Sequence, residues 1–577
     1  MNKKQNFLTG AAILSLSTII VKIIGMFYKI PLNAVIGEQG FAYFTAAYDI
    51  YTVLLVISTT GLPVAMSRMV SEAHTLGNGK QMQRIFRTAL TAYMIIGTIG
   101  TLAMMLLPGI LAGWMEMPKA SYSIFALGPA VFFICFASAG RGFFQGQGDM
   151  RPTAISQIIE AAGKLFLGLS FAYLVMRWTG SVAYSSGATI AGISIGAGLS
   201  ALYVLIAYRR NREEVARLGA GTKSYRSTAK KHGKKRKRNN TLVGGVESYR
   251  STAKKLLSIA VPITIGNAGL QLINLLDSMT VVRRLLHAAE SQGAAAINKL
   301  LDIARLNPSA DQALSQDAAE IAKGIYSFCQ TIFNLPTALI PCITAAIIPA
   351  ITAHLTKKDH DGVKNVQNSS LRVMALVAAP CAMGMLVLAE PIMALLGRYE
   401  GDKLAIAAVL LMILAPTIIV NSVTNMTTAI MQAHNHMVIP VINTLIGGLL
   451  KVGVNYILVG NPAIAIMGAP IGTFVCFLTI MILNLIAMKR VLKDPPKVFS
   501  CMWRSLLAAT GMGVITFFVY KFLMGIFGSF VLCCIGSIGI AVIIYLLLVI
   551  VLKPVTYSDC LLLPKGEKIA KILKIKE

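Results

Sequence analysis

The chain has 577 residues, of which 55% are apolar and only 13% charged, with a mean hydropathy of +0.68 and a formal net charge of +29. Soluble proteins carry about 25% charged residues, whereas here apolar stretches long enough to cross a bilayer recur along the whole sequence. This composition excludes a soluble enzyme, a disordered scaffold and a secreted disulfide-bonded protein, and it predicts an all-α polytopic membrane protein.

The apolar stretches predict about fourteen membrane-spanning helices. They begin near residues 8, 44, 88, 120, 153, 181, 256, 325, 371, 404, 438, 464, 503 and 530. An even number of spans places both termini on one side, and with that side inside, about three quarters of the 53 Lys and Arg residues fall on the inner face. We therefore predict a multi-pass protein of the bacterial cytoplasmic membrane with both termini cytoplasmic, and its charge requires no nucleic acid.

The first span contains two lysines, Lys22 and Lys29, seven residues apart and hence on one helical face. Ionisable groups within a span usually face a cavity or a partner. Lys22 lies near the middle of the span and is expected to line a polar cavity, whereas Lys29 either lines that cavity or reaches the headgroups. Asp49, at the start of the second span, is a candidate ion-coupling group or lysine partner, or else lies in the headgroup zone.

A basic and acidic set follows around the fourth and fifth spans. Glu160 precedes Lys164 by four residues, the order that favours an ion pair on one helix, so we expect a structural pair. Arg141 begins the loop RGFFQGQGDMRP, where it either anchors the inner face or contacts substrate.

The segment 209–255 is the most basic part of the chain and contains KKHGKKRKR at 230–238. Such a run also occurs in nuclear-localisation and nucleic-acid-binding segments. Between two spans, contact with anionic lipid headgroups is the interpretation we favour. The octapeptide SYRSTAKK occurs twice in this segment, at 224–231 and 248–255, without an evident functional reason.

Asp277 lies within the seventh span, in LINLLDSMTVV. An intramembrane carboxylate is a candidate site for Na⁺ or H⁺ coupling, with Asn274 nearby. The alternative is a partner for a basic residue of the other half of the chain, and the sequence leaves both interpretations open.

An internal repeat relates the two halves. Residues 127–165 match 414–452 at a constant offset, and 48–63 match 326–341 in the same order; the matched pairs include Pro129 with Pro416, Gln145 with Gln432, Lys164 with Lys451, and Tyr48 with Tyr326. The repeat predicts two homologous six-helix lobes related by an axis along the membrane normal, as in transporters. The predicted segments are 1–208 (first lobe), 209–255 (basic linker), 256–490 (second lobe) and 491–577 (two further helices and a basic tail).

Lys451 has Gly447 where its repeat counterpart has an acid, so we expect it to face the cavity without a local partner. The predicted substrate-binding residues are therefore Lys22, Lys29, Arg141 and Lys451. Basic groups with few acids suit an anionic substrate such as a diphosphate headgroup, and suit lipophilic cationic drugs poorly.

Enzyme motifs and metal sites are not evident. The sequence has no P-loop, HExxH or GxSxG motif, and its nine cysteines show no metal-ligand spacing. We therefore predict a non-enzymatic transporter without a bound cofactor, apart from a coupling Na⁺ or H⁺.

The stretches 141–164 (RGFFQGQGDMRPTAISQIIEAAGK) and 61–73 (GLPVAMSRMVSEA) resemble the stage V sporulation protein B and polysaccharide-biosynthesis branch of the bacterial flippases. The spacing of Lys22 and Gly25 resembles the basic-x-x-Gly of lipid II flippases. In one respect the chain departs from them, since those proteins carry an Arg shortly before a Leu-Pro in the eighth span and CQTIFNLP has no basic residue.

The resemblance implies a MATE-like flippase fold, with two lobes around a central cavity. It implies movement of undecaprenyl-diphosphate-linked sugar precursors from the inner to the outer leaflet by alternating access, for peptidoglycan or polysaccharide synthesis, with cell-wall or polysaccharide synthesis proteins as partners. It also implies that Lys22 contacts the headgroup and that Asp277 takes part in sodium coupling. Two alternatives are a cation-coupled multidrug exporter of the MATE type and a non-transporting scaffold for envelope synthesis.

Overall fold

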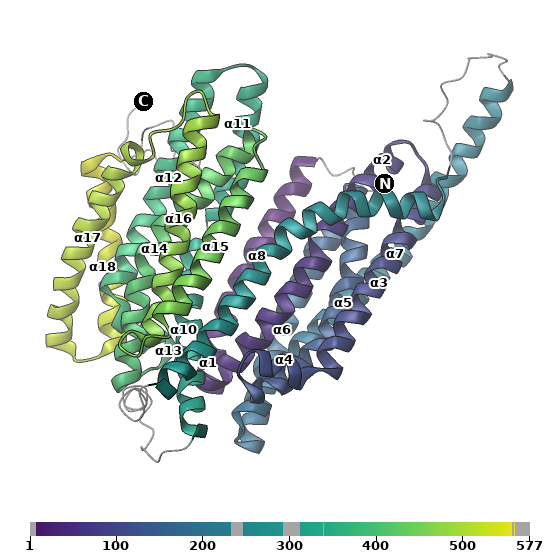
Figure 1. Ribbon diagram of the computed structural model, residues 1–577. Coiled ribbons are helices and arrows are strands. Elements are labelled where there is room, and N and C mark those ends of the chain that lie inside the picture. The colour runs from purple at the N-terminus through teal and green to yellow at the C-terminus, as the bar shows by residue number, and fades with distance from the viewer. Residues whose placement is uncertain are drawn as a thin grey trace. The chain divides into compact units, whose positions relative to one another are not determined.

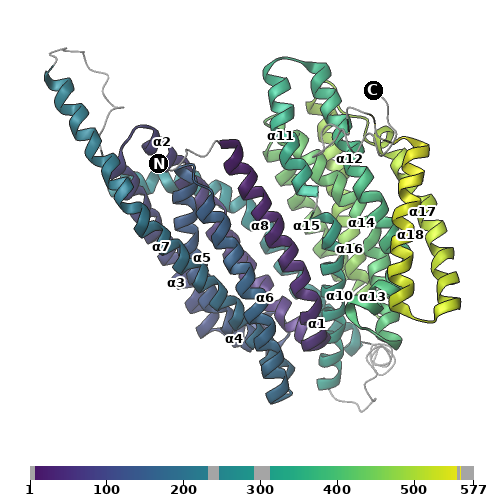
Figure 2. The same ribbon diagram turned by 180° about the vertical axis from the view of Figure 1, so that it is seen from behind.

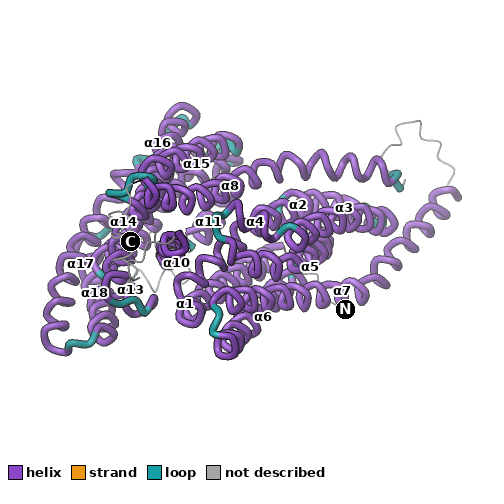
Figure 3. Tube along the Cα trace, turned by 60° about the horizontal axis from the view of Figure 1, so that its bottom comes forward, coloured by secondary structure: helices purple, strands orange, loops and turns teal. Residues whose placement is uncertain are grey.

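The computed structural model describes residues 7–231, 246–291, 312–338, 340–554, 556 and 559. Within these ranges the secondary structure is entirely helical, as Figure 3 shows by colour. Eleven of the helical segments are long and apolar enough to cross a membrane by length and composition. The prediction of an all-α multi-pass membrane protein is confirmed, while the number of fourteen spans and the two six-helix lobes stay predictions.

The chain divides into two compact units, residues 1–275 and 276–577. The division falls inside one helix, and the sequence-based start of the second lobe, residue 256, lies earlier in the same helix. Figure 1 labels the helices along the chain. Up to and including the divided helix they are α1 (Phe7–Thr59), α2 (Gly61–Thr75), α3 (Gly79–Leu106), α4 (Pro108–Trp114), α5 (Ser121–Gly146), α6 (Arg151–Thr179), α7 (Val182–Lys231) and α8 (Tyr249–Ser291).

The remaining helices belong to the second unit, and Figure 2 shows them from behind. They are α10 (Gln312–Thr337), α11 (Ile340–Thr356), α12 (His360–Val387), α13 (Ala389–Gly397), α14 (Gly401–Ala433), α15 (Val438–Leu458), α16 (Gly468–Val491), α17 (Val498–Phe527) and α18 (Phe530–Leu552). Two short 3₁₀ turns, Pro118–Ala120 and Ala465–Met467, precede α5 and α16.

Helix α1 contains the first two predicted spans and is interrupted between them. Gly37 has a φ of 65° and is not helical. This left-handed region costs glycine little because it has no Cβ. A residue with a side chain at position 37 would strain the backbone that joins the two halves of α1.

Glycines set a close approach between α6 and α7 in the first unit. A Cβ on Gly163 would lie 2.5 Å from the Cα of Gly196, and one on Gly192 would lie 2.5 Å from the backbone nitrogen of Gly168. Small residues at such crossings let helix backbones pack closely within a membrane. The rest of the α6 surface, including Lys164, is then available to α1, which also packs against α6.

Helices α17 and α18 pack against α12 and lie side by side in Figures 1 and 2. Ala379 of α12 belongs to one apolar cluster with Ala508, Met512 and Tyr545 of these two helices. The Tyr545 hydroxyl also donates to the Leu376 carbonyl at 2.9 Å. The two helices outside the sequence repeat are thus held to the second unit by both packing and hydrogen bonding.

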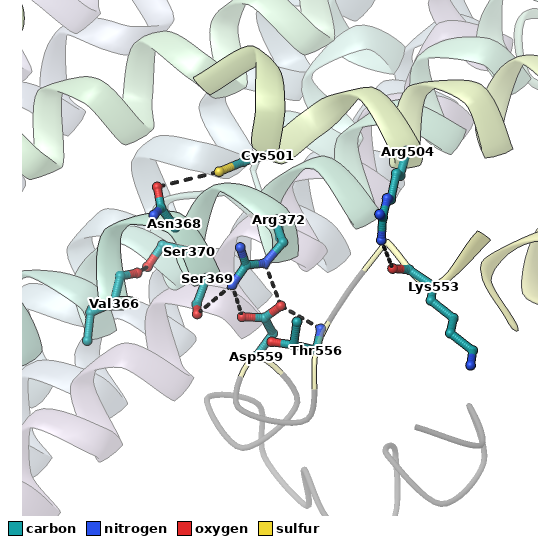
Figure 4. Close-up of polar contacts among 10 residues, drawn as sticks. All are labelled: Val366, Asn368, Ser369, Ser370, Arg372, Cys501, Arg504, Lys553, Thr556 and Asp559. Carbon is teal, nitrogen blue, oxygen red and sulfur yellow. Dashed lines mark hydrogen bonds and ion pairs between the residues drawn. The ribbon is translucent and has the colours of Figure 1, made fainter. Parts of the chain in front are cut away.

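The chain after α18 returns to α12 through an ion pair shown in Figure 4. Asp559 is fully buried, and its carboxylate accepts from Nε and Nη2 of Arg372 at 2.6 and 2.7 Å. The backbone N–H of Thr556 donates to the same carboxylate at 2.7 Å. The two hydrogen bonds from Arg372 tie the chain after α18 to α12, and the bond from Thr556 orders the turn that presents Asp559.

Candidate functional site

Lys164 of α6 lies among aromatic rings of α1 in the first unit. Its ammonium nitrogen is 5.1, 5.9 and 4.6 Å from the ring centroids of Tyr28, Phe44 and Tyr48. It also donates to the Tyr48 hydroxyl at 3.4 Å. The rings present their negative faces to the cation, a contact that stabilises a desolvated ammonium without an opposite charge. We call Lys164 with these three rings the aromatic lysine site.

Lys29 follows Tyr28 on α1 and is half-buried. It lies close enough to Lys164 for the two ammonium groups to repel each other, and Asp49 offsets part of that repulsion. Lys22, the other lysine on this face of α1, is exposed. The structure thus brings Lys29 next to an additional basic residue, Lys164, that the sequence assigned to a structural pair.

Glu160 does not take Lys164 as its ion-pair partner, so the expected pair on α6 is wrong. Its carboxylate accepts from Nη2 of Arg141 at 2.8 Å, and the same nitrogen donates to the Ser200 hydroxyl at 2.8 Å. Nε of Arg141 donates to Ser156 at 2.8 Å. These hydrogen bonds join Arg141 of α5 to α6 and α7 and hold the Glu160 carboxylate on one side of α6. Lys164 points toward α1 instead.

Arg141 is therefore a buried crosslink between helices of the first unit, with an 11% exposed side chain. The sequence offered an inner-face anchor or a substrate contact for it. Its guanidinium is satisfied by protein groups in this conformation, so contact with an anion would require these bonds to open.

A second ionic site lies in the second unit. Nζ of Lys451 on α15 is 2.8 Å from a carboxylate oxygen of Asp277 on α8, and the two side chains are 11% and 6% exposed. The side-chain amide of Asn455, one turn after Lys451, donates to the other oxygen of Asp277. We call these three residues the Asp277 site.

Two expectations change at the Asp277 site. Lys451 was expected to face a cavity without a partner, and it has one in Asp277. Of the two interpretations of Asp277, the structure favours a basic partner, which comes from the same unit rather than from the other half of the chain. The reason is that the acid missing from α15 at Gly447 is supplied by α8.

Tyr326 of α10, the repeat counterpart of Tyr48, adjoins the Asp277 site and interacts electrostatically with both Lys451 and Asp277. Its hydroxyl is 2.9 Å from the Thr473 hydroxyl of α16 and accepts from Gln330 at 3.0 Å. Both units therefore place a tyrosine close to the lysine of the repeat.

Three residues of these sites were missed from the sequence, namely Phe44, Tyr28 and Asn455. Phe44 and Asn455 carry a signal in retrospect, because each lies four residues from a selected residue, Tyr48 and Lys451, and thus on the same helical face. Tyr28 directly precedes Lys29, and nothing in the sequence alone distinguishes it from an ordinary apolar residue of the span.

Residues 232–245 of the basic linker, which include 232–238 of the KKHGKKRKR run, lie outside the described residues. The linker before them, 209–231, continues α7, and its end after them is described and contacts the first unit. Arg84 lies over the Tyr249 ring at 4.5 Å, and the Glu247 N–H donates to Gln81 at 3.0 Å. Among the described residues no group of three or more His, Cys, Asp or Glu side chains could hold a metal ion.

Several solved structures share the fold. The inward closed conformation of the lipid II flippase MurJ aligns with a TM-score of 0.62 at 14% identity, covering 95% of this chain and 99% of that one. An inward-facing multidrug resistance MATE family transporter of the MOP superfamily aligns with a TM-score of 0.60 at 15% identity, covering 83% and 98%. These likenesses confirm the MATE-like fold.

Sequence relatives point to the same group. The lipid II flippase MurJ of Bacillus subtilis is 24% identical over 501 residues, which cover 84% of this chain and 83% of the relative. Stage V sporulation protein B of the same organism is 23% identical over 492 residues, or 85% of each chain. The lipid II flippase MurJ family profile matches residues 256–536. The profile described as polysaccharide biosynthesis protein matches residues 7–355, more than half of the sequence, and the chain belongs to that family.

Proposed function

We propose that this membrane protein is a flippase that moves lipid-linked sugar precursors, with an undecaprenyl diphosphate carrier, from the inner to the outer leaflet. The family, the MATE-like fold and the relatives named as lipid II flippase and stage V sporulation protein B support this function. Peptidoglycan or surface polysaccharide synthesis would consume the product.

The observation that carries the proposal is the positive charge of the aromatic lysine site. Glu160 forms its ion pair with Arg141, so the acid nearest in sequence acts on Lys164 only at longer range and not as a contact partner. Lys164, which lies over ring faces, and Lys29, which interacts with it electrostatically, then present two ammonium groups on α6 and α1. A diphosphate would relieve their mutual repulsion and accept hydrogen bonds from both.

In the proposed cycle the headgroup enters from the cytoplasmic side, and its diphosphate binds Lys29 and Lys164, with the exposed Lys22 as an earlier contact on the same face of α1. Arg141 and Lys451 would join only if their ion pairs open. Alternating access then exposes the headgroup outside, while the prenyl tail remains in lipid. Cytoplasmic termini, and anionic lipids at the 209–255 linker, belong to this proposal.

The test is translocation of a labelled undecaprenyl-diphosphate oligosaccharide by the full chain reconstituted in vesicles. We expect Lys164→Ala and Lys29→Ala each to lower the initial rate by at least about tenfold, since a hydrogen bond to a charged group contributes about 1.5–3 kcal/mol. Lys493→Ala, an exposed loop lysine, is the matched control and should transport normally. Wild-type rates from both lysine variants would contradict the site.

A cation-coupled exporter of the MATE type is the second candidate, supported by the fold alone. Such an exporter should bind cationic substrates at unpaired acids. Transport of cationic dyes by wild type, without movement of any diphosphate lipid, would favour this candidate and exclude the flippase.

A further inference from the structure

We propose that the Asp277 site is a monovalent-cation site whose cation is built into the chain, because the ammonium of Lys451 takes the position that Na⁺ would otherwise fill. The second unit would then need no bound Na⁺. This inference concerns the second unit only and does not depend on the transported substrate.

The first step in the argument is the charge of Asp277. Its side chain is 6% exposed, and a buried carboxylate is costly unless a cation, a proton or several donors compensate it. Asn455 supplies one neutral donor. Lys451, at 2.8 Å, supplies the compensating positive charge, so the Asp277 site as folded is close to neutral.

The second step concerns the oxygen atoms of the residues next to the ion pair. Asn455 is fully buried, and its side-chain oxygen has no hydrogen-bond partner within the described part of the chain. The Tyr326 hydroxyl interacts with both charges and is joined to Thr473. Carboxylate, amide and hydroxyl oxygens form the kind of set that hard cations prefer.

The third step concerns space. Gly472 of α16 faces Asn455 so closely that a Cβ on it would lie 1.9 Å from the amide oxygen. Glycine at this position therefore leaves room for the amide to stand against α16 with its oxygen unpaired. An uncompensated acceptor held in this way next to a carboxylate would be a cation ligand once the ammonium is removed.

The fourth step is the contrast with the first unit. Lys164 contacts ring faces and a hydroxyl, and the nearby carboxylate of Glu160 stays paired with Arg141 when the Lys164 ammonium is removed. Removing the Lys451 ammonium uncovers Asp277. Only the second substitution should therefore create a cation site, which makes Lys164 the matched control.

The experiment follows thermal unfolding of the purified full chain in NaCl, KCl or choline chloride at equal ionic strength. We expect the Tm of wild type to be the same in all three salts. Lys451→Met should have a lower Tm in choline and gain about 2–4 °C in Na⁺, because a cation that binds only the folded state stabilises it. Lys164→Met should show no such response.

Two further variants test whether the positive charge at position 451 and the carboxylate of Asp277 cause the response to Na⁺. Lys451→Arg retains the internal cation and should be indifferent to the salt, and the double variant Asp277→Asn with Lys451→Met should lose the response to Na⁺. If Lys451→Met does not fold, Lys451→Gln replaces it, and the yield of folded protein in Na⁺ against choline becomes the readout.

Two results would overturn the proposal. A Na⁺-specific rise in the Tm of wild type would mean that the Lys451 ammonium does not fill the site. An equal Tm, or an equal loss of folded protein, in Na⁺ and choline for the Lys451 variants would mean that Asp277 without its lysine is neutralised by a proton and takes no metal cation.

Discussion

The two lysines of the repeat, Lys164 and Lys451, are accommodated in opposite ways. Lys164 lies over three aromatic rings and its ammonium contacts no carboxylate, whereas Lys451 forms an ion pair with Asp277. The two environments differ in the helix that contacts the lysine. Helix α1 brings Tyr28 and Lys29 to Lys164, whereas α8 brings the carboxylate of Asp277 to Lys451. The two lysines that the sequence repeat pairs thus lie in one site where aromatic rings surround the ammonium and in one site where a carboxylate balances it.

The two arrangements differ in what a neutral substitution leaves behind. Truncating one member of a buried ion pair leaves the other charge without compensation, at about 3–5 kcal/mol. A cation over an aromatic ring contributes about 0.5–2 kcal/mol, and removing it leaves only apolar ring faces. Stability should therefore depend strongly on Lys451 and weakly on Lys164, and transport should depend on Lys164.

Lys451→Met is expected to have the largest effect. It should lower the free energy of unfolding by about 3–5 kcal/mol in Na⁺-free buffer, because Asp277 would remain buried beside a single amide donor. Unfolding of the purified chain, followed by fluorescence in such a buffer, measures this loss.

The control for Lys451→Met is the double variant that also carries Asp277→Asn. Removing both charges should recover most of the lost stability, since two neutral groups of similar shape cost little when buried together. A double variant as unstable as Lys451→Met would show that the lysine stem, rather than its charge, stabilises α15.

The repeat made this comparison visible from the sequence, since it pairs Lys164 with Lys451 and Tyr48 with Tyr326. The all-α membrane fold followed equally directly from composition and from the length of the apolar runs. The pairing of the lysines and the membrane fold can both be predicted because they depend on which residue types follow one another along the chain, and not on contacts between distant helices.

Ion-pair partners could not be predicted in the same way. Spacing along one helix favours Glu160 with Lys164, yet Arg141 from a neighbouring helix competes successfully because it brings several donors and bonds to Ser156 and Ser200 as well. Asp277 and Lys451 are far apart in sequence and meet only through helix packing. Such choices depend on tertiary geometry.

Asp559→Asn tests an ion pair whose carboxylate is buried and whose arginine is partly exposed, and it should lower the free energy of unfolding by about 2 kcal/mol. Burial alone would raise the pKa of Asp559, but hydrogen bonds from Arg372 and the Thr556 N–H hold this pKa below its usual value. The contact therefore stabilises the fold at neutral pH and is lost only as the pH falls below about 4.

Urea unfolding of wild type and Asp559→Asn at neutral and acidic pH measures this contribution. We expect the difference between the two chains to shrink in acid, when the wild-type carboxylate is protonated. A difference that is constant with pH would assign the loss of stability to shape or hydrogen bonding instead of charge. The stability lost in Asp559→Asn could then not be compared with the loss expected when the charge balance of the Asp277 site is disturbed.

Lys164→Met should cost only about 1 kcal/mol of stability, because the cation–π contacts are replaced by apolar contacts with the same rings. Translocation should nevertheless fall by at least about tenfold, as the diphosphate would lose a charged donor. Parallel measurement of unfolding and of vesicle transport separates the two effects. A large loss of stability with unchanged transport would reverse the roles assigned to the two lysines.

Tyr48→Phe should have the smallest effect and isolates the ring from its hydroxyl. The contact from Lys164 to that hydroxyl is 3.4 Å long, near the limit for a hydrogen bond, so its loss should change stability by no more than about 0.5 kcal/mol. The ring face remains in Tyr48→Phe, so its transport rate should fall by less than about threefold. Tyr48→Leu removes the ring as well, and its transport rate should fall further. If Tyr48→Phe transported as poorly as Lys164→Met, the Tyr48 hydroxyl itself would have to contact the substrate. The aromatic rings would then not be the groups that hold the Lys164 ammonium in position to bind an anion.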